Sequence, residues 1–78
     1  MDTELLIAQM EQMLENAANE EDVAADNEYI WAIGAPDAEQ TKMHIDNMEQ
    51  HKLFARIYRR MKDDCLAFIE TYEDDARV

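Results

Sequence analysis

Apolar residues recur every three or four positions through most of this chain, which is the period of a helix that is buried on one side. In the first third of the chain they are Leu6, Met10, Met13, Leu14 and Ala17. In the last third they are Phe54, Ile57, Met61, Cys65, Phe68 and Tyr72, with Tyr58 and Ile69 beside them. The alternation that is typical of strands is absent from these segments, so the pattern predicts an all-α fold.

Capping and stop signals divide the predicted helices into three. Asn19 precedes three acidic residues and suits an N-cap, while Gly34 suits a left-handed C-cap that Pro36 would follow. Asp37 and Gln40 have the spacing of a capping box. We therefore predict helices over about residues 3–17, 20–33 and 37–73. An alternative makes residues 29–33 a strand, because Tyr, Ile and Trp favour sheets, but a lone strand would have to pair across a dimer.

The third predicted helix carries two apolar stripes on different faces. Thr41, Ile45, Met48 and Ala55 lie roughly 140° around the helix from the stripe that begins at Phe54. One possibility is a bend or break at residues 47–52, where Asn47 and Gln50 could form a second capping box. The other is a single helix of about 54 Å that uses its two faces on two partners, and this one requires another protein chain.

The length and the lone cysteine limit the class of protein. Seventy-eight residues suit a single acidic helical domain over residues 1–78, but supply little core, so we expect a homodimer. Cys65 cannot form an intrachain disulfide, and its place on an apolar stripe predicts a buried, unreactive thiol in a cytoplasmic protein. The longest apolar block, residues 29–35, is too short for a membrane span, and Asp2 and Glu4 argue against a signal peptide.

Charge is distributed unevenly along the chain. The net charge is −12; residues 1–50 hold thirteen acidic residues and one basic residue, whereas residues 51–78 hold six of each. Direct binding to nucleic acid is therefore not expected, because phosphate contacts need a basic footprint. The candidate partner-binding residues are Glu4, Glu11, Glu15, Glu20, Glu21, Asp22 and Trp31. The alternatives are an ordinary solvated face for the carboxylates and a core position for Trp31.

A basic stripe lies opposite the apolar stripe of the third predicted helix, at Lys52, Arg56, Arg59 and Arg60. It could be a solvated face that Asp63 and Asp64 partly neutralise from four residues away. It could pair with the acidic face of the first helix, in the same or another subunit. It could also bind an anion or nucleotide at a subunit junction.

Catalytic and metal-binding patterns are weak. His44, Met48 and His51 share one helical face, but two histidines without a third strong ligand do not make a typical site, so we expect no metal and no cofactor. No glycine-rich loop is present to build an oxyanion pocket, so we do not expect an enzyme.

The sequence thus favours a non-catalytic protein-interaction module. The most specific hypothesis is a small acidic inhibitor that occupies a basic, nucleic-acid-binding surface of a partner protein, by analogy of class with phage anti-defence proteins. The first alternative is a helical homo-oligomer that binds a small anionic ligand through Arg56, Arg59 and Arg60. The second is a structural or regulatory subunit of a permanent complex.

Overall fold

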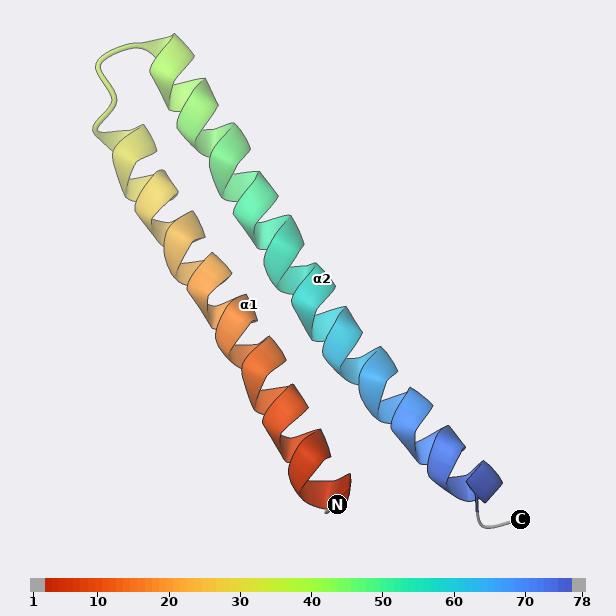
Figure 1. Ribbon diagram of the computed structural model, residues 1–78. Helices are drawn as coiled ribbons and strands as arrows, with labels where there is room; N and C mark the ends of the chain where they lie inside the picture. Colours follow the sequence, from red (N-terminus) through yellow and green to blue (C-terminus); the bar gives the residue numbers. More distant parts are fainter. Residues whose placement is uncertain (1–2, 77–78) are drawn as a thin grey trace.

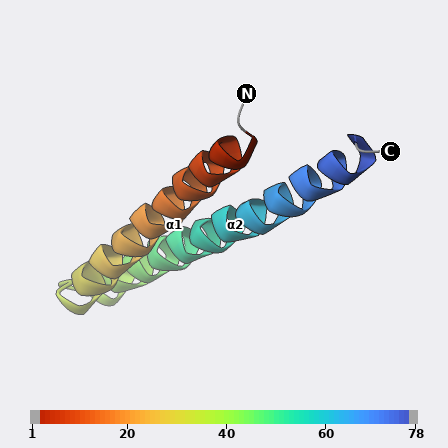
Figure 2. The same ribbon diagram turned by 90° about the horizontal axis from the view of Figure 1, so that it is seen from below.

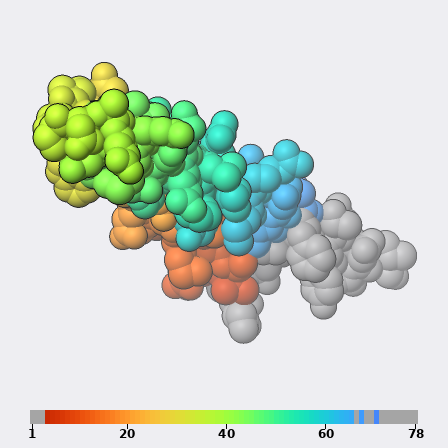
Figure 3. Space-filling model, turned by 90° about the horizontal axis from the view of Figure 1, so that it is seen from above, coloured from red at the N-terminus to blue at the C-terminus, as the bar shows by residue number. Residues whose placement is uncertain are grey.

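The computed structural model describes residues 3–76, apart from the side chains of Thr3, Leu66, Phe68, Ile69 and residues 71–76. Within this range the chain is a helical hairpin, with α1 at Thr3–Ile33 and α2 at Ala38–Ala76 (Figure 1). The helices run antiparallel in an elongated body whose extents are 62 × 17 × 11 Å (Figure 3). Residues 3–76 contain no strand, which confirms the all-α prediction and excludes the strand alternative at residues 29–33.

The prediction of three helices is wrong in its first part, because residues 3–33 form one helix rather than two. Asn19, the expected N-cap, lies inside α1. Asparagine is only mildly unfavourable in a helix interior, and residues 17–20 contain neither glycine nor proline, so nothing forces a break there. The flanking residues Ala18 and Ala25 are both buried, and their packing favours an uninterrupted helix.

Helix α2 passes through residues 47–52 without interruption. The proposed break is therefore absent, and α2 is the single long helix of the alternative; the use of its two faces on two partners stays a prediction. Asn47 and Gln50 lie within α2 and do not cap a helix. The last two apolar positions of the predicted stripe, Phe68 and Tyr72, lie outside the described side chains.

The turn between the helices is fixed by the expected cap but not by the expected glycine. The backbone N–H of Gln40 donates to Oδ1 of Asp37 at 2.8 Å, as an N-cap requires. The N–H of Gly34 donates to the carbonyl of Ile30 at 3.2 Å, yet no residue in the described range has a positive φ. The left-handed C-cap at Gly34 is thus wrong. Pro36, which lacks an N–H, and the Asp37 cap are sufficient to end one helix and begin the next.

Small side chains hold the two helices together. The buried apolar residues are Ala18, Ala25, Ala32 and Ala55, which we call the alanine seam. Three of them are seven residues apart on α1, a spacing that keeps one face of a helix against its partner. Seven residues beyond Ala18 and Ala55, towards the free ends, are Glu11 and Lys62, whose longer side chains do not allow so close an approach. Both ribbon views accordingly show the helices diverging towards the free ends (Figures 1 and 2).

Candidate functional site

Two carboxylate–imidazole pairs define the register of the hairpin. Nδ1 of His44 lies 2.6 Å from Oε2 of Glu28, and Nδ1 of His51 lies 2.5 Å from Oε2 of Glu21. Both pairs are separated by seven residues on each helix, so equivalent positions of α1 and α2 face each other at every second turn. Continued towards the free ends, this register sets Tyr58 opposite Leu14 and Cys65 opposite Ile7.

The register gives the hairpin two contrasting halves. The loop-end half comprises residues 20–52, and the open-end half comprises residues 3–19 and 53–70. The loop-end half holds nine acidic and two basic residues, a net charge of −7 with neutral histidines, whereas the open-end half holds six acidic and four basic residues, a net charge of −2. The positions of this register are occupied by Glu21, Glu28, His44 and His51 in the first half and by Ile7, Leu14, Tyr58 and Cys65 in the second.

The histidine–glutamate pairs are partly buried. The side chains of His44 and Glu28 are 20% and 12% exposed, and those of His51 and Glu21 are 33% and 24% exposed. Trp31 lies against the first pair, with its ring centroid 5.9 Å from that of His44. Among the described residues, no three His, Cys, Asp or Glu side chains come together as a metal site. The shared face of His44 and His51 therefore serves contacts between the helices.

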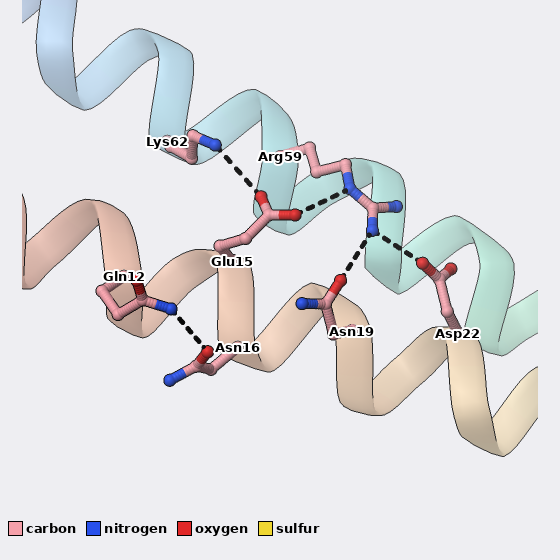
Figure 4. A network of polar contacts seen from close by, with 7 residues as sticks. All are labelled: Gln12, Glu15, Asn16, Asn19, Asp22, Arg59 and Lys62. Atoms are coloured by element: carbon pink, nitrogen blue, oxygen red, sulfur yellow. Dashed lines mark hydrogen bonds and ion pairs between the residues drawn. The ribbon is translucent and has the colours of Figure 1, made fainter.

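An ion-pair cluster lies on the other side of the hairpin. Nη2 of Arg59 donates to Oδ2 of Asp22 at 2.6 Å and to Oδ1 of Asn19 at 3.3 Å (Figure 4). The Glu15 carboxylate lies between two cations, 3.9 Å from Nε of Arg59 and 3.0 Å from Nζ of Lys62 (Figure 4). The hydrogen bond to Asp22 raises the pKa of Arg59, and desolvation opposes it more weakly. Among the described residues of the basic stripe, Arg59 is the one that pairs with α1, and Lys62, which joins it, lies outside that stripe.

The rest of the basic stripe is arranged differently. Arg60 pairs with Asp64 one turn along its own helix, at 3.2 Å. Lys52 and Arg56 are exposed and have no ion-pair partner among the described residues. Together with Arg59 they border an open hollow of about 600 Å³, which Asp22, Met48, Glu49 and Ala55 also line. The lining thus carries three cationic side chains and two carboxylates, a net charge of +1.

The predicted partner-binding carboxylates do not form one surface. Glu15, Glu21 and Asp22 are engaged by cationic or imidazole side chains of α2, and Glu11 is half-buried between the helices. Glu4 and Glu20 are both exposed, but they are sixteen residues apart along α1. Trp31 is 55% exposed, so the core position weighed for it is wrong. Its exposure leaves the ring available to a partner.

Large apolar side chains of the open-end half are left uncovered by the hairpin. We call the set of Leu6, Met10, Met13, Phe54, Ile57 and Met61 the open-end apolar face. Apart from Met10, which is half-buried, these side chains are 40–66% exposed. Their spacing is that of a buried stripe and predicts core positions for them. The hairpin does not bury them, because the facing positions between the helices in this half are occupied by Leu14, Tyr58, Ile7 and Cys65.

The histidine–glutamate pairs are the residues that sequence reasoning missed. The sequence pattern predicts partner binding for Glu21, offers the two histidines only as weak metal ligands, and gives no role to Glu28. The signal was present, because Glu21 and Glu28 are spaced by seven residues and so are His44 and His51. Matching spacings on two antiparallel helices predict facing pairs once the hairpin is known.

Comparison with known proteins adds no identification. No protein-family model, curated protein or solved structure matches this chain. Over the described residues, neither helix is apolar for long enough to cross a membrane. Any functional conclusion therefore rests on the surfaces described above.

Proposed function

We propose that this chain is a non-catalytic protein-interaction module that places its acidic loop-end half on a basic surface of a partner protein. The observation that carries the proposal is the net charge of −7 over residues 20–52, which α1 and α2 bring together at one end of the rod. Such a concentration of one sign attracts a surface of opposite charge and speeds the encounter with it.

Five carboxylates of this half are available for a partner. Glu20, Asp26, Glu39, Asp46 and Glu49 are exposed and have no ion pair with another described residue. The other four acidic residues of the half have internal roles: Glu21 and Glu28 on the histidines, Asp22 on Arg59, and Asp37 as the helix cap. We therefore expect the basic surface of the partner to contact these five exposed carboxylates.

The narrower form of the proposal is an inhibitor that covers a nucleic-acid-binding surface, of the phage anti-defence type. It is supported by the same charge and by exposed carboxylates on both helices. The alternative of an anion-binding oligomer has less support, because Arg59 and Arg60 are already paired with carboxylates. A homodimer is part of the proposal, since the hairpin leaves large apolar side chains uncovered.

The test compares two double variants on α2 that remove the same charge. The first, Asp46→Asn with Glu49→Gln, lies in the loop-end half; the second, Asp63→Asn with Glu70→Gln, lies in the open-end half, and all four residues are exposed. Proteins captured from the native host would be identified by mass spectrometry, and their affinity for each variant measured at low and physiological salt.

We expect the loop-end variant to bind several-fold more weakly, mainly through a slower association rate, and the difference to shrink as salt is added. The open-end variant should bind like the unmodified protein. Under the narrower form, duplex DNA or RNA should compete for the captured protein. Equal binding by both variants, or equal weakening, would contradict the proposal.

A further inference from the structure

The residues of the open-end apolar face lie on one side of the hairpin. His44 contacts both Glu28 and Trp31, which places the histidine–glutamate pairs and Trp31 on the same side. On α1, Met10 lies three heptads before Trp31, so the two residues are on the same side of the helix. On α2, Met61 and Phe54 are each three residues after a facing position, Tyr58 and His51 respectively, so they also lie on the side of Trp31. Asp22, which pairs with Arg59, is nine residues before Trp31 and so lies about 180° around α1 from it, on the opposite side. One side of the open-end half is therefore apolar and the other charged.

The hairpin exposes more surface than a self-sufficient protein of its size. Its accessible surface is 6080 Å², whereas a folded monomer of 9.1 kDa is expected to expose about 4,900 Å². Its radius of gyration is 17.9 Å, against about 11.5 Å for a compact chain of this length. The excess of about 1,200 Å² per chain, or about 2,400 Å² for two, falls in the range that obligate homodimers bury.

A like-charged copy can approach this face because it carries no charge. None of its six residues is ionisable, although the chain as a whole carries −12. Burial against the same face of a second copy would cover the methionine, leucine, isoleucine and phenylalanine side chains. Asp64, seven residues after Ile57, borders the face, and its charge is paired with Arg60. Interfaces rich in Met and Phe with few charges are typical of such contacts.

The apolar side is interrupted where the loop-end half begins, although exposed Trp31 and Met43 lie farther along it. The positions that repeat Met13 at seven-residue intervals are Glu20 and Asn27, and those that precede Phe54 and Ile57 by seven residues are Asn47 and Gln50. Burying these side chains would cost their hydration without supplying partners. Two loop-end halves laid together would also oppose charges of −7 and −7. Full-length overlap with both loops at one end is thus disfavoured.

We propose that a second copy of this chain covers the open-end apolar face, and that the two hairpins overlap through their open-end halves with their loops pointing in opposite directions. The result is a four-helix bundle of about 30 Å, or about 20 residues per helix, flanked by an acidic loop-end half on each side. This inference specifies the homodimer named in the proposed function, and each flanking half remains free for the basic partner.

The test of the face uses two matched double variants. Ile57→Glu with Met61→Glu places charges on the open-end apolar face, whereas Val23→Glu with Ile30→Glu places them on exposed apolar residues of α1 in the loop-end half. We expect sedimentation equilibrium to give a dimer for the unmodified protein at about 10 µM, and the first variant to raise the dissociation constant at least ~100-fold. The second variant should remain dimeric.

The orientation is tested on the unmodified protein by small-angle X-ray scattering, which does not depend on a variant that could fail to fold. Opposed hairpins of 62 Å that share about 30 Å should have a maximum dimension of about 95 Å. A dimer with a maximum dimension near 62 Å would overturn the orientation. Two results would overturn the open-end apolar face as the dimer interface. One is a monomeric mass for the unmodified protein at about 100 µM; the other is a dimer that dissociates only in the Val23→Glu, Ile30→Glu variant.

A separate measurement distinguishes this inference from the proposed function. The Asp46→Asn and Glu49→Gln variant should keep the dimer mass, because these residues are outside the overlap. If this variant loses partner binding but remains a dimer, both the dimer and the proposed function are supported. If the protein binds its partner as a monomer, the dimer is overturned and the proposed function is not.

Discussion

The two halves of the hairpin use equivalent positions in opposite ways. Towards the loop, facing positions hold Glu21 with His51 and Glu28 with His44; towards the free ends, the same register sets Leu14 opposite Tyr58 and Ile7 opposite Cys65. The loop-end half is joined by alanine packing and polar pairs, both of which are satisfied within one chain. The open-end half keeps larger apolar side chains that one chain cannot bury.

The difference indicates that the two halves of the hairpin have different structural roles. Polar pairs between facing positions fix the alignment of two helices, because a shift by one position leaves carboxylates and imidazoles without partners. Apolar positions are tolerant of register but favour burial. The loop-end half therefore sets the geometry of the hairpin, and the open-end half provides the surface for assembly.

The largest expected effect concerns the helix that joins the halves. Replacing Glu20 by Pro should lower the free energy of unfolding by about 3 kcal/mol or more, because proline removes a hydrogen bond and clashes inside a helix. Glu20 is exposed, so Glu20→Ala is a control for loss of the side chain alone. Urea denaturation at a fixed protein concentration measures the difference.

If Asn19 began a helix, as the sequence suggested, proline at residue 20 would occupy the first helical position and be tolerated. A change below about 1 kcal/mol for Glu20→Pro would therefore restore the boundary at residue 19.

The next prediction separates the alanine seam from other alanines. Ala25 is 2% exposed between the helices, so Ala25→Leu should force them apart and cost about 1–3 kcal/mol. Ala8→Leu, at an exposed position of the same helix, should have little effect because alanine and leucine have similar helix propensities. Similar urea midpoints for the two variants would mean that the seam does not hold the loop-end half together.

A smaller effect is expected for the polar pairs. A double-mutant cycle of His44→Ala and Glu28→Ala should give a coupling of about 1 kcal/mol, since the pair is mostly buried and hydrogen-bonded. The same cycle on the exposed Arg60–Asp64 pair should give about 0.3 kcal/mol. Equal couplings would remove the special role assigned to the loop-end pairs.

The smallest effect concerns the exposed ion-pair cluster. Arg59→Gln should lower the unfolding temperature more than Arg56→Gln, because Arg56 has no ion pair with a described residue, and added salt should reduce the difference. The hydrogen bond to Asp22 raises the folded-state pKa of Arg59 above its ordinary value, so its contribution is present at lower pH and is lost only as the pH rises through the raised pKa. Calorimetry from about pH 6 to about pH 9 should therefore show no loss of the Arg59 contribution through this guanidinium.

The sequence by itself determined the helical class, the end of one helix near Ile33 and the start of the next at Asp37. These features depend on local chemistry: helical periodicity, a proline that cannot continue a helix, and a carboxylate that accepts from a nearby N–H. The sequence also predicted that the two apolar stripes of α2 lie on different faces, because the angle between them follows from residue spacing alone.

Only the tertiary structure decided how α1 runs, which carboxylates are engaged and where the large apolar residues lie. Asn19 had the chemistry of a cap, but packing of Ala18 and Ala25 against α2 outweighs a weak local preference. Glu15, Glu21 and Asp22 resemble free surface charges until residues some 30 to 47 positions away are brought beside them. An apolar stripe shows that a side chain favours burial; whether its own chain can cover it depends on which side chains already occupy the space between the helices.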